Sequence, residues 1–518
     1  MQSSILLNLL MQKLTIDLIN QLVFKTKNIE IDDETLKRVQ QSFAFLTNFS
    51  KDKIIYGINT GFGPMAQFRI EPDQLNQLQY NLIKSHASGI GNVLTAPYAK
   101  SVVLARLNSF LQGNSGISSD VILQLQMFFN KNIIPEIFEH GSVGASGDLV
   151  QLSHLALNLI GEGYVYENGK RKEAKTVLEA HQIKPLKLNL RDGLGIINGT
   201  SCMTGIAAIN LIYAKRLLNH AIAASAIINE IVESFDDSFS KELNEVKLHK
   251  GQQNVAAQMR SFLKNSQLIR KRDDLFKDDT ELQRTEFKKK IQEYYSIRCV
   301  PQILGPISDT LDYAQEVVEN ELNSTNDNPI INIDVKNVFH GGNFHGDYIS
   351  LEMDKIKMAI TKLSMLMERQ LNFLLNHHLN GKFPAFLNAG KLGLNFGFQG
   401  IQYTATSTTA ENQVLSNSMY VHSIPNNNDN QDIVSMGTNS AIIAKQVLDN
   451  AYQVTAIHIM AICQAIDLLS DEEKGKLSNN TKTAYHKIRK IAFFVKEDVS
   501  QAKSINDVCN FMKENSLI

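Results

Sequence analysis

Cysteine is scarce in this sequence, and its four copies are scattered along the 518 residues without a CxxC pair. A disulfide framework and a cysteine-type zinc site are therefore not indicated. No apolar run reaches the ~20 residues that a membrane-spanning helix requires. Basic and acidic side chains number 52 and 53, so the net charge is −1 and no overall field attracts nucleic acid or an anionic membrane. We expect a protein of a reducing, cytoplasmic compartment that binds neither nucleic acid nor membranes.

The N-terminal segment MQSSILLNLLMQK contains a short apolar patch but lacks two parts of a secretory signal. No basic residue precedes the patch, and no small-residue cleavage site follows it. We therefore expect a local extension of the fold at this end.

Long helices are predicted in three segments, at about residues 206–235, 349–379 and 436–469, and 43% of the chain is apolar. In the second segment two apolar rows recur every seven residues: Ile349, Ile356 and Leu363, and Met353, Ile360, Met367 and Leu374. Helices of ~30 residues exceed the usual globular length and favour a bundle with coiled-coil-like packing. Helices of this length often continue into a subunit interface.

A mainly α fold is thus expected, with a loop-rich N-terminal part that carries short strands. The expected domains are 1–190, with the loop-rich part, 191–470, with the long-helix bundle, and 471–518, with a C-terminal helical segment. A polar stretch at about 264–290 alternates in charge sign and is typical of a solvated surface insertion.

The tripeptide Ala145-Ser146-Gly147 has unusual chemistry because glycines surround it, in the segment GSVGASGDL. Gly147 offers an unhindered backbone nitrogen, Ser146 a hydroxyl that can leave as water, and Ala145 a carbonyl with little bulk beside it. If a strained loop presses that nitrogen against that carbonyl, ring closure with loss of two waters gives a methylidene-imidazolone, which is an electrophile. Taken alone, the segment fits an ordinary glycine-rich turn before a core helix equally well.

A helix is predicted directly after this loop. Asp148 followed by Gln151 has the pattern of a capping box, and apolar residues continue at helical spacing up to Gly161. The loop would then lie at the positive end of the helix dipole, where developing negative charge is stabilised.

Other polar, glycine-rich segments interrupt the predicted helices. Tyr56 lies in YGINTGFGP, which has three glycines but neither GxGxxG nor a following Lys-Ser or Lys-Thr, so a phosphate-binding loop is excluded. Tyr295 and Arg298 in YSIRC are three residues apart and share a helix face, where the guanidinium suits a carboxylate or a buried ion pair. His340 and His345 match no common zinc spacing, and we reject a metal site there.

Taken together, these segments resemble the aromatic amino acid ammonia-lyases, the histidine, phenylalanine and tyrosine enzymes that use a methylidene-imidazolone group. The resemblance runs from about residue 14 to about residue 469 and includes, in the family's order, YGINTGFGP, SHASGIG, GSVGASGDL, INGTS, YSIRC, DNP, GNFHG, AEN and NQD. The run SNSMYVHSIPNNNDNQDIVSMG is most similar to bacterial tyrosine ammonia-lyases.

The resemblance implies a fumarase/aspartase-like helix bundle and a set of roles. Ala145, Ser146 and Gly147 would form the electrophile without metal or nucleotide, and Tyr56 would take a β-proton from the substrate. Asn198 and Tyr295 would support the prosthetic group and the amino group, and Arg298 would bind the carboxylate. The remaining implied positions line the substrate site: His86, Gln292, Phe344, Glu411 and Gln431. The resemblance also implies a homotetramer with each site assembled from three subunits.

The substrate stays open between alternatives. The Ser85-His86 pair is seen in histidine ammonia-lyases, and Glu411 is compatible with an imidazole, whereas segment 430–434 is more similar to tyrosine and phenylalanine enzymes. We favour L-tyrosine giving p-coumarate and ammonia over L-histidine giving urocanate. An aminomutase with the same electrophile is a third possible activity. A non-catalytic scaffold is disfavoured by the intact Tyr56, Ser146 and Arg298, and a fumarase-like lyase by the absence of a Met-Pro-x-Lys-x-Asn signature.

Overall fold

The computed structural model describes residues 7–8, 13–25, 27–278, 281, 283–287 and 290–517, with the backbone alone at 7–8. The expected N-terminal extension therefore lies almost wholly outside the described residues. Two of its residues, β1 (Leu7–Asn8), pair in parallel with β2 (Ile29–Glu30). Among the described residues, no helix combines the length and the apolar character needed to cross a membrane. All four cysteines are free.

The chain divides into two compact units, each made of three segments. Unit 1 comprises Met1–Ile212, Ala314–Asp354 and Ser418–Lys445, and unit 2 comprises Tyr213–Tyr313, Lys355–Asn417 and Gln446–Ile518. The boundaries fall inside or beside the long helices, so the units interleave along the sequence. The contiguous domains expected from the sequence stay a prediction.

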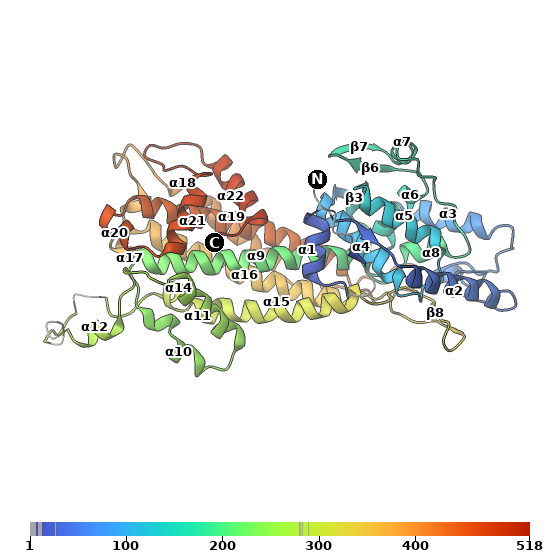
Figure 1. Ribbon diagram of the computed structural model, residues 1–518, viewed down its shortest axis with the longest axis horizontal. Helices are drawn as coiled ribbons and strands as arrows, with labels where there is room; N and C mark the ends of the chain where they lie inside the picture. Colours follow the sequence, from blue (N-terminus) through green and yellow to red (C-terminus); the bar gives the residue numbers. More distant parts are fainter. Residues whose placement is uncertain are drawn as a thin grey trace. The chain divides into compact units, whose positions relative to one another are not determined.

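Four long helices dominate the fold: α9 (Ser201–Ile231), α15 (Val300–Leu322), α16 (Asp347–Leu375) and α19 (Gly437–Asp467) (Figure 1). Three of them confirm the predicted segments, and both heptad rows of α16 are fully buried. This confirms the mainly α class. Sequence reasoning missed α15, which contains Pro306 in its interior, and an internal proline normally argues against a helix.

Unit 1 contains the shorter helices and small sheets of the N-terminal part. Its helices are α1 (Ile16–Phe24), α2 (Asp33–Phe49), α3 (Leu75–His86), α4 (Ala96–Leu111), α5 (Ser119–Asn130), α6 (Leu149–Leu159), α7 (Ala174–Ala180), α8 (Asp192–Ile197) and the 3-10 helix η1 (Gly63–Met65). Helix α4 is the core of the unit, since every side chain from Tyr98 to Leu111 is buried. The predicted short strands are present in this part of the chain.

The strands form small antiparallel sheets besides the β1–β2 pair. β3 (Ile90–Val93) pairs with β5 (Phe138–His140), and β8 (Ile330–Asn332) with β9 (Asn337–Phe339). The third sheet has the order β4 (Ile134–Pro135), β6 (Tyr164–Glu167), β7 (Lys170–Glu173). Its β6–β7 hairpin is the teal ribbon of Figure 1.

In unit 2, shorter helices accompany the parts of the long helices that belong to this unit. These are η2 (Asp236–Phe239), α10 (Lys241–Glu245), α11 (Lys250–Phe262), α12 (Arg272–Phe276), α14 (Tyr295–Arg298), α17 (His377–Asn380), η3 (Ala385–Leu387), α18 (Gln399–Leu415), α20 (Asp471–Lys476), α21 (Asn479–Arg489) and α22 (Ala502–Glu514). Helix α12 buries none of its residues, and Arg272 pairs with Asp237 at 2.9 Å. The described part of the 264–290 stretch is thus a charged surface segment, as expected.

Candidate active site

Six of the predicted site residues line one pocket of unit 1: Tyr56, His86, Ser146, Asn198, Phe344 and Gln431. They come from six separate stretches of the sequence. The pocket has a volume of about 870 Å³, and much of its remaining wall is apolar, with Phe62, Met65, Phe68, Leu78, Leu82 and Leu149. A few polar groups that converge in an apolar cavity are the usual composition of a small-molecule site.

The loop that carries Tyr56 is fixed by glycine geometry. Gly57 has φ +75°, and a Cβ there would come within 2.3 Å of Leu194 Cδ2, so only glycine fits. The Gly63 backbone N–H donates to the phenol oxygen of Tyr56 at 3.1 Å. Phe62 meets the tyrosine ring edge-on, with 6.3 Å between centroids. The phenol is therefore held in one orientation at the pocket wall.

The Ala145–Gly147 segment is pressed against residues near Asn198. Gly147 has φ +73°, and a Cβ there would lie 2.0 Å from the Gly199 carbonyl oxygen. The same oxygen accepts from the Asp148 N–H at 2.8 Å. The close approach demands glycine at 147 and holds the backbone in a conformation that other residues rarely adopt. Of the two interpretations that the sequence left open, the close approach at Gly147 favours the constrained loop.

Ser146 has a donor at each of its oxygens. Its hydroxyl accepts from Gln431 Nε2 at 2.8 Å. Its carbonyl oxygen accepts from Asn198 Nδ2 at 3.0 Å and from the Gly199 N–H at 3.3 Å. In a methylidene-imidazolone this carbonyl would be the ring oxygen, which draws electrons from the ring. Two donors at that oxygen and small residues on both sides of Ser146 are what the group needs, so the residues fit it.

The predicted capping box at Asp148 is wrong. Asp148 holds the N-cap position of α6, but its side chain makes no cap bond there. Its carboxylate accepts instead from the N–H groups of Cys202 and Met203, both at 2.8 Å, and from the Thr438 hydroxyl. It therefore caps α9, a helix that begins more than fifty residues later. Burial raises the pKa of Asp148 to about 6, against the lowering effect of these donors.

Gln151, which was expected to complete the capping box, bonds elsewhere. Gln151 accepts from the Ser142 N–H at 3.0 Å and donates to the Glu139 carbonyl. Ser142 supplies the cap of α6, because its hydroxyl accepts from the Val150 N–H at 3.1 Å. The electrophile segment still precedes the N-terminus of α6, and Asp148 ties it to the N-terminus of α9 as well.

His86 ends α3 with its ring partly fixed. Nδ1 lies 2.9 Å from the Leu82 carbonyl oxygen and 3.0 Å from the Ser85 hydroxyl. A carbonyl oxygen only accepts, so Nδ1 carries a proton. In the neutral ring Nε2 is then a hydrogen-bond acceptor.

Four predicted residues belong to unit 2 and do not line this pocket: Gln292, Tyr295, Arg298 and Glu411. Tyr295 is 70% exposed, and the Arg298 guanidinium lies 4.7 Å from its ring centroid, which confirms their shared face. Arg298 Nη1 is buried without a hydrogen-bond partner among the described residues. Glu411 accepts from Asn450 at 2.9 Å.

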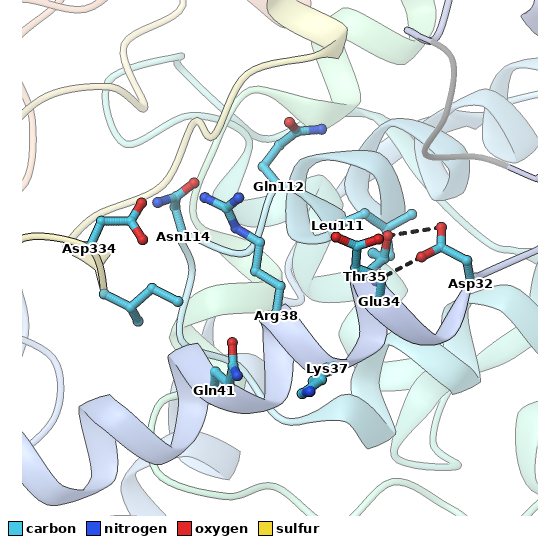
Figure 2. Close-up of a pocket in the computed structure, with 11 residues that line it drawn as sticks. Asp32, Glu34, Thr35, Lys37, Arg38, Gln41, Leu111, Gln112, Asn114 and Asp334 are labelled. Atoms are coloured by element: carbon cyan, nitrogen blue, oxygen red, sulfur yellow. Dashed lines mark hydrogen bonds between the residues drawn. The ribbon is translucent and has the colours of Figure 1, made fainter.

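A second hollow of unit 1 is larger, at about 1010 Å³, but none of the predicted site residues lines it. Figure 2 shows its charged wall, which includes Asp32, Lys37 and Arg38. Asp32 caps α2 by accepting from the Thr35 N–H at 2.8 Å and the Thr35 hydroxyl at 3.0 Å. The stem of Arg38 fills the space beside Gly113, where a Cβ would meet it at 2.9 Å. These side chains serve local structure.

Sequence reasoning missed two polar residues around the electrophile segment, Arg106 and Arg191, and it gave no role to Asp327 and Asn328 of the DNP motif. The two arginines and Asp327 are fully buried. Arg106 is the single charge in the otherwise uncharged SVVLARLNSFL, and a charge inside such a helix was the available signal. Among the described residues, no group of three or more His, Cys, Asp or Glu side chains is arranged to hold a metal, and His345 pairs with Asp347.

The sequence and the fold match proteins of known activity. The sequence model of the family described as aromatic amino acid lyase matches residues 14–490. The MIO-dependent tyrosine 2,3-aminomutase of Streptomyces globisporus is 36% identical over 98% of this chain and 95% of its own length. Its crystal structure superposes with a TM-score of 0.93, covering 97% of this chain and 95% of that chain at 35% identity.

Two further relatives have other activities. Histidine ammonia-lyase of Staphylococcus aureus is 36% identical, over 97% of each chain. The structure of Pantoea agglomerans phenylalanine aminomutase has a TM-score of 0.93 at 30% identity, covering 99% of this chain and all of that chain. These matches confirm the family expected from the motifs, while the particular likeness to tyrosine ammonia-lyases stays a prediction. The chain belongs to the aromatic amino acid lyase family.

Proposed function

We propose that the chain removes ammonia from an aromatic L-amino acid, and that L-tyrosine is converted to trans-p-coumarate. A methylidene-imidazolone formed from Ala145, Ser146 and Gly147 would supply the electrophile that turns the amino group into a leaving group. The observation that carries the proposal is the pocket, which brings Ser146, Tyr56 and His86 together within a largely apolar wall.

Tyr56 is proposed as the base that takes the β-proton. The Gly63 N–H donates to its oxygen at 3.1 Å, so the oxygen keeps a fixed direction, and once the phenol has lost its own proton a lone pair there can take the β-proton. A fixed orientation of this kind is what general-base catalysis requires. Asn198 is proposed to hold the carbonyl of Ser146, and Arg298 to bind the substrate carboxylate through two parallel hydrogen bonds.

His86 supports tyrosine as the substrate. Its Nδ1 is committed to the Leu82 carbonyl, which leaves Nε2 as an acceptor. A phenol hydroxyl is a donor that matches it, and the apolar side chains beside it, such as Leu78 and Leu82, suit the ring. Phenylalanine would leave Nε2 unpaired in the bound state, which lowers its affinity relative to tyrosine.

The direct test is incubation of the purified protein with tyrosine, phenylalanine and histidine in separate reactions. We expect absorbance of p-coumarate from tyrosine at a higher kcat/KM than cinnamate from phenylalanine, and no urocanate from histidine. Urocanate as the main product would identify histidine, and not tyrosine, as the substrate. No unsaturated product from any of the three would refute the deamination proposal.

Two relatives favour other outcomes and make them the second candidates. The tyrosine 2,3-aminomutase and the histidine ammonia-lyase match this chain at the same identity of 36%. An aminomutase would return ammonia to the bound intermediate, so chiral chromatography of the tyrosine reaction would show β-tyrosine. A β-tyrosine yield above that of p-coumarate would assign the aminomutase reaction.

We also propose a homotetramer with shared active sites. The described residues that line the pocket in one chain all belong to unit 1, whereas Arg298, Tyr295, Gln292 and Glu411 belong to unit 2. Mixing Tyr56→Phe with Arg298→Met subunits tests the sharing. If sites are shared, hybrids regain activity because some sites combine intact halves, and light scattering should give the mass of four chains. A monomeric mass with no recovery would refute shared sites. The cytoplasmic location stays a prediction.

A further inference from the structure

Two arginines of unit 1 are fully buried, which is rare for this residue type. Arg106 lies on α4 and Arg191 directly precedes α8. Burial lowers the pKa of Arg106 to about 10, and the nearby Asp327 acts in the opposite direction. Burying a guanidinium is unfavourable unless its N–H groups and its charge are matched. Their retention beside the proposed active site therefore calls for a function.

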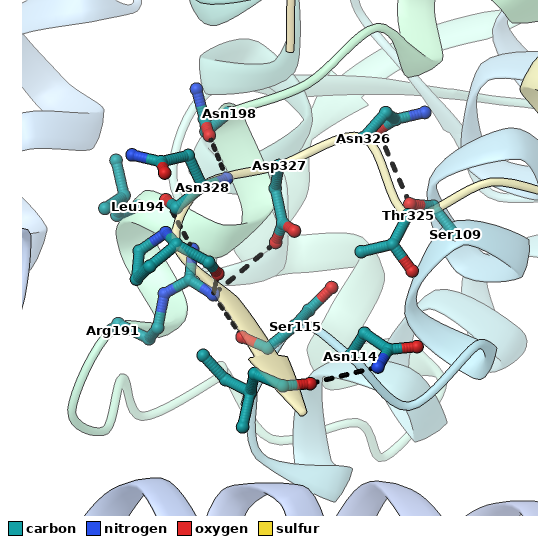
Figure 3. A network of polar contacts seen from close by, with 12 residues as sticks. Ser109, Asn114, Ser115, Arg191, Leu194, Asn198, Thr325, Asn326, Asp327 and Asn328 are labelled. Atoms are coloured by element: carbon teal, nitrogen blue, oxygen red, sulfur yellow. Dashed lines mark hydrogen bonds and ion pairs between the residues drawn. The ribbon is translucent and has the colours of Figure 1, made fainter. Parts of the chain in front are cut away.

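Arg191 fixes the segment that contains Asn328 (Figure 3). Its guanidinium donates to the Asn328 carbonyl at 2.9 Å, to the Pro329 carbonyl at 3.3 Å and to the Ser115 carbonyl. Asp327 pairs with Nη1 at 3.5 Å. One planar side chain thus ties three backbone carbonyls to a single position.

Asn328 in turn orients the amide of Asn198. The Asn328 N–H donates to Asn198 Oδ1 at 2.8 Å, as Figure 3 shows. With Oδ1 committed, the NH₂ group must point the other way, and Nδ2 donates to the Ser146 carbonyl at 3.0 Å. If the Asn328 peptide shifted, the amide would be free to turn and present its oxygen to that carbonyl, which is repulsive.

Arg106 holds the second donor. Its Nη1 donates to the Asn198 carbonyl at 2.7 Å, which belongs to the same peptide as the Gly199 N–H. That N–H donates to the Ser146 carbonyl at 3.3 Å. The carboxylate oxygens of Asp327 are buried without a hydrogen bond among the described residues. Asp327 therefore acts as a counter-charge, and both arginines are subject to it.

We propose that Arg191 and Arg106 are positioning residues that each fix one of the two donors to the Ser146 carbonyl, with Asp327 as their shared counter-charge. This inference rests on the proposed function, because the Ser146 carbonyl would become the ring oxygen of the electrophile. Donors fixed in advance at an oxygen that gains negative charge are more effective than mobile ones. Neither arginine is among the described residues that line the pocket, so both would act through other groups.

The test uses Arg191→Lys, which keeps the charge beside Asp327 but loses the planar fork. Peptide mass spectrometry across residues 141–151 reports the fraction of chains that have lost two waters, and the ultraviolet band of the ring reports its polarity. We expect a smaller dehydrated fraction or a shifted band, with kcat lower by roughly 10- to 100-fold, the size that a small misplacement produces. KM should change little.

A matched control is Arg489→Lys in unit 2. Arg489 pairs with Asp467 and donates to the Ala492 carbonyl at 2.7 Å, and its Nε is unpartnered, as in Arg191. The control should lose thermal stability without a change in the dehydrated fraction or the band. If Arg191→Lys does not fold, Asp327→Asn provides the test instead. The Asn amide has the size of the Asp327 carboxylate, which makes no hydrogen bond among the described residues, so the replacement should fit the same space.

The pathway through Asn198 is tested by a double-mutant cycle. In the Asn198→Ala background, Arg191→Lys should leave the band and the dehydrated fraction where Asn198→Ala alone places them. An undiminished effect in that background would overturn the proposal, as would folded Arg191→Lys and Asp327→Asn proteins with a wild-type band and kcat. If the wild-type chain itself shows no loss of two waters, the proposed function is refuted, whatever the arginine variants do. Failure of the proposed function and failure of the positioning proposal are therefore distinguishable.

Discussion

The two hollows of unit 1 differ in a way that volume does not reveal. The hollow beside α2 is the larger, and most of its wall is charged or polar, but its described groups serve local structure: Asp32 caps a helix and Arg38 packs on Gly113. The smaller pocket has an apolar wall in which Tyr56 and Ser146 are held by backbone and amide donors. The comparison teaches that polar groups held within an apolar wall, rather than space or charge, identify the candidate site.

The largest expected effect comes from removing the hydroxyl of Ser146. Ser146→Ala cannot lose the β-hydroxyl, so the ring cannot form and activity should fall to background. Mass spectrometry should show the tripeptide without loss of two waters. Ser153→Ala is the control, since the Ser153 hydroxyl donates to the Leu149 carbonyl within α6 and does not line the pocket. In this variant the tripeptide should lose both waters normally. Activity in Ser146→Ala would refute the proposed electrophile.

A smaller loss is expected from Tyr56→Phe, which removes the proposed base and keeps the ring. Activity should fall by roughly 10²- to 10⁴-fold, the usual contribution of a general base, while the ultraviolet band of the electrophile remains. Tyr80→Phe is matched, because the Tyr80 hydroxyl also accepts from a backbone N–H, that of Leu188, yet does not line the pocket. Full turnover by Tyr56→Phe would remove this residue from the mechanism.

Changes at His86 should alter selectivity more than rate. His86→Leu removes the acceptor for a phenol, so the ratio of kcat/KM for tyrosine over phenylalanine should fall about 10-fold or more. His86→Gln keeps an acceptor in its amide oxygen and should retain part of the preference. If both variants discriminate as the wild type does, the phenol does not bind at this residue.

The smallest effect on catalysis is expected in the other hollow. Asp32→Ala should leave kcat/KM unchanged and lower the free energy of unfolding by about 1 kcal/mol, as loss of an N-cap does. Asp33→Ala, in the first turn of α2 but outside the cap position, should lower it less. A large fall in kcat/KM would show that the two hollows are not functionally separate.

The stabilising effect of Asp32 should also depend on pH in a known direction. The Thr35 N–H lowers the folded-state pKa of Asp32 below 3.8. The carboxylate therefore stabilises the fold fully above 3.8, and the contribution is lost as the pH falls through the lowered folded-state pKa. Unfolding curves of wild type and Asp32→Ala should converge in acid. A constant difference down to the lowest pH would contradict the charged cap.

Much of this structure was predictable because its causes are local. The seven-residue rows at Met353 and Ile356 identified α16, since burial of one helix face imposes that spacing. The glycines around Ser146 indicated a constrained loop, which Gly147 confirms. The comparisons left the individual site residues untested, and their roles stay predictions.

What the sequence did not reveal depends on partners that are distant along the chain. Asp148 has the pattern of a local cap, but α9 offers it two N–H groups and the buried carboxylate goes there. The contact of Arg191 with Asn328 joins residues 137 positions apart, and no local spacing encodes it. Pro306 lies inside α15 against the local preference of proline, where the tertiary structure prevails over propensity.

The contact of Gly147 with Gly199 also has a consequence for biosynthesis. The groups that hold the tripeptide belong to residues 198–199 and to Gln431, and Asn328 in turn orients Asn198. A nascent chain that has not reached these positions cannot bend the tripeptide into a reactive shape. Ring formation would therefore occur only after most of the polypeptide has left the ribosome. The presence of the ring in a chain would then show that this chain had reached its folded state.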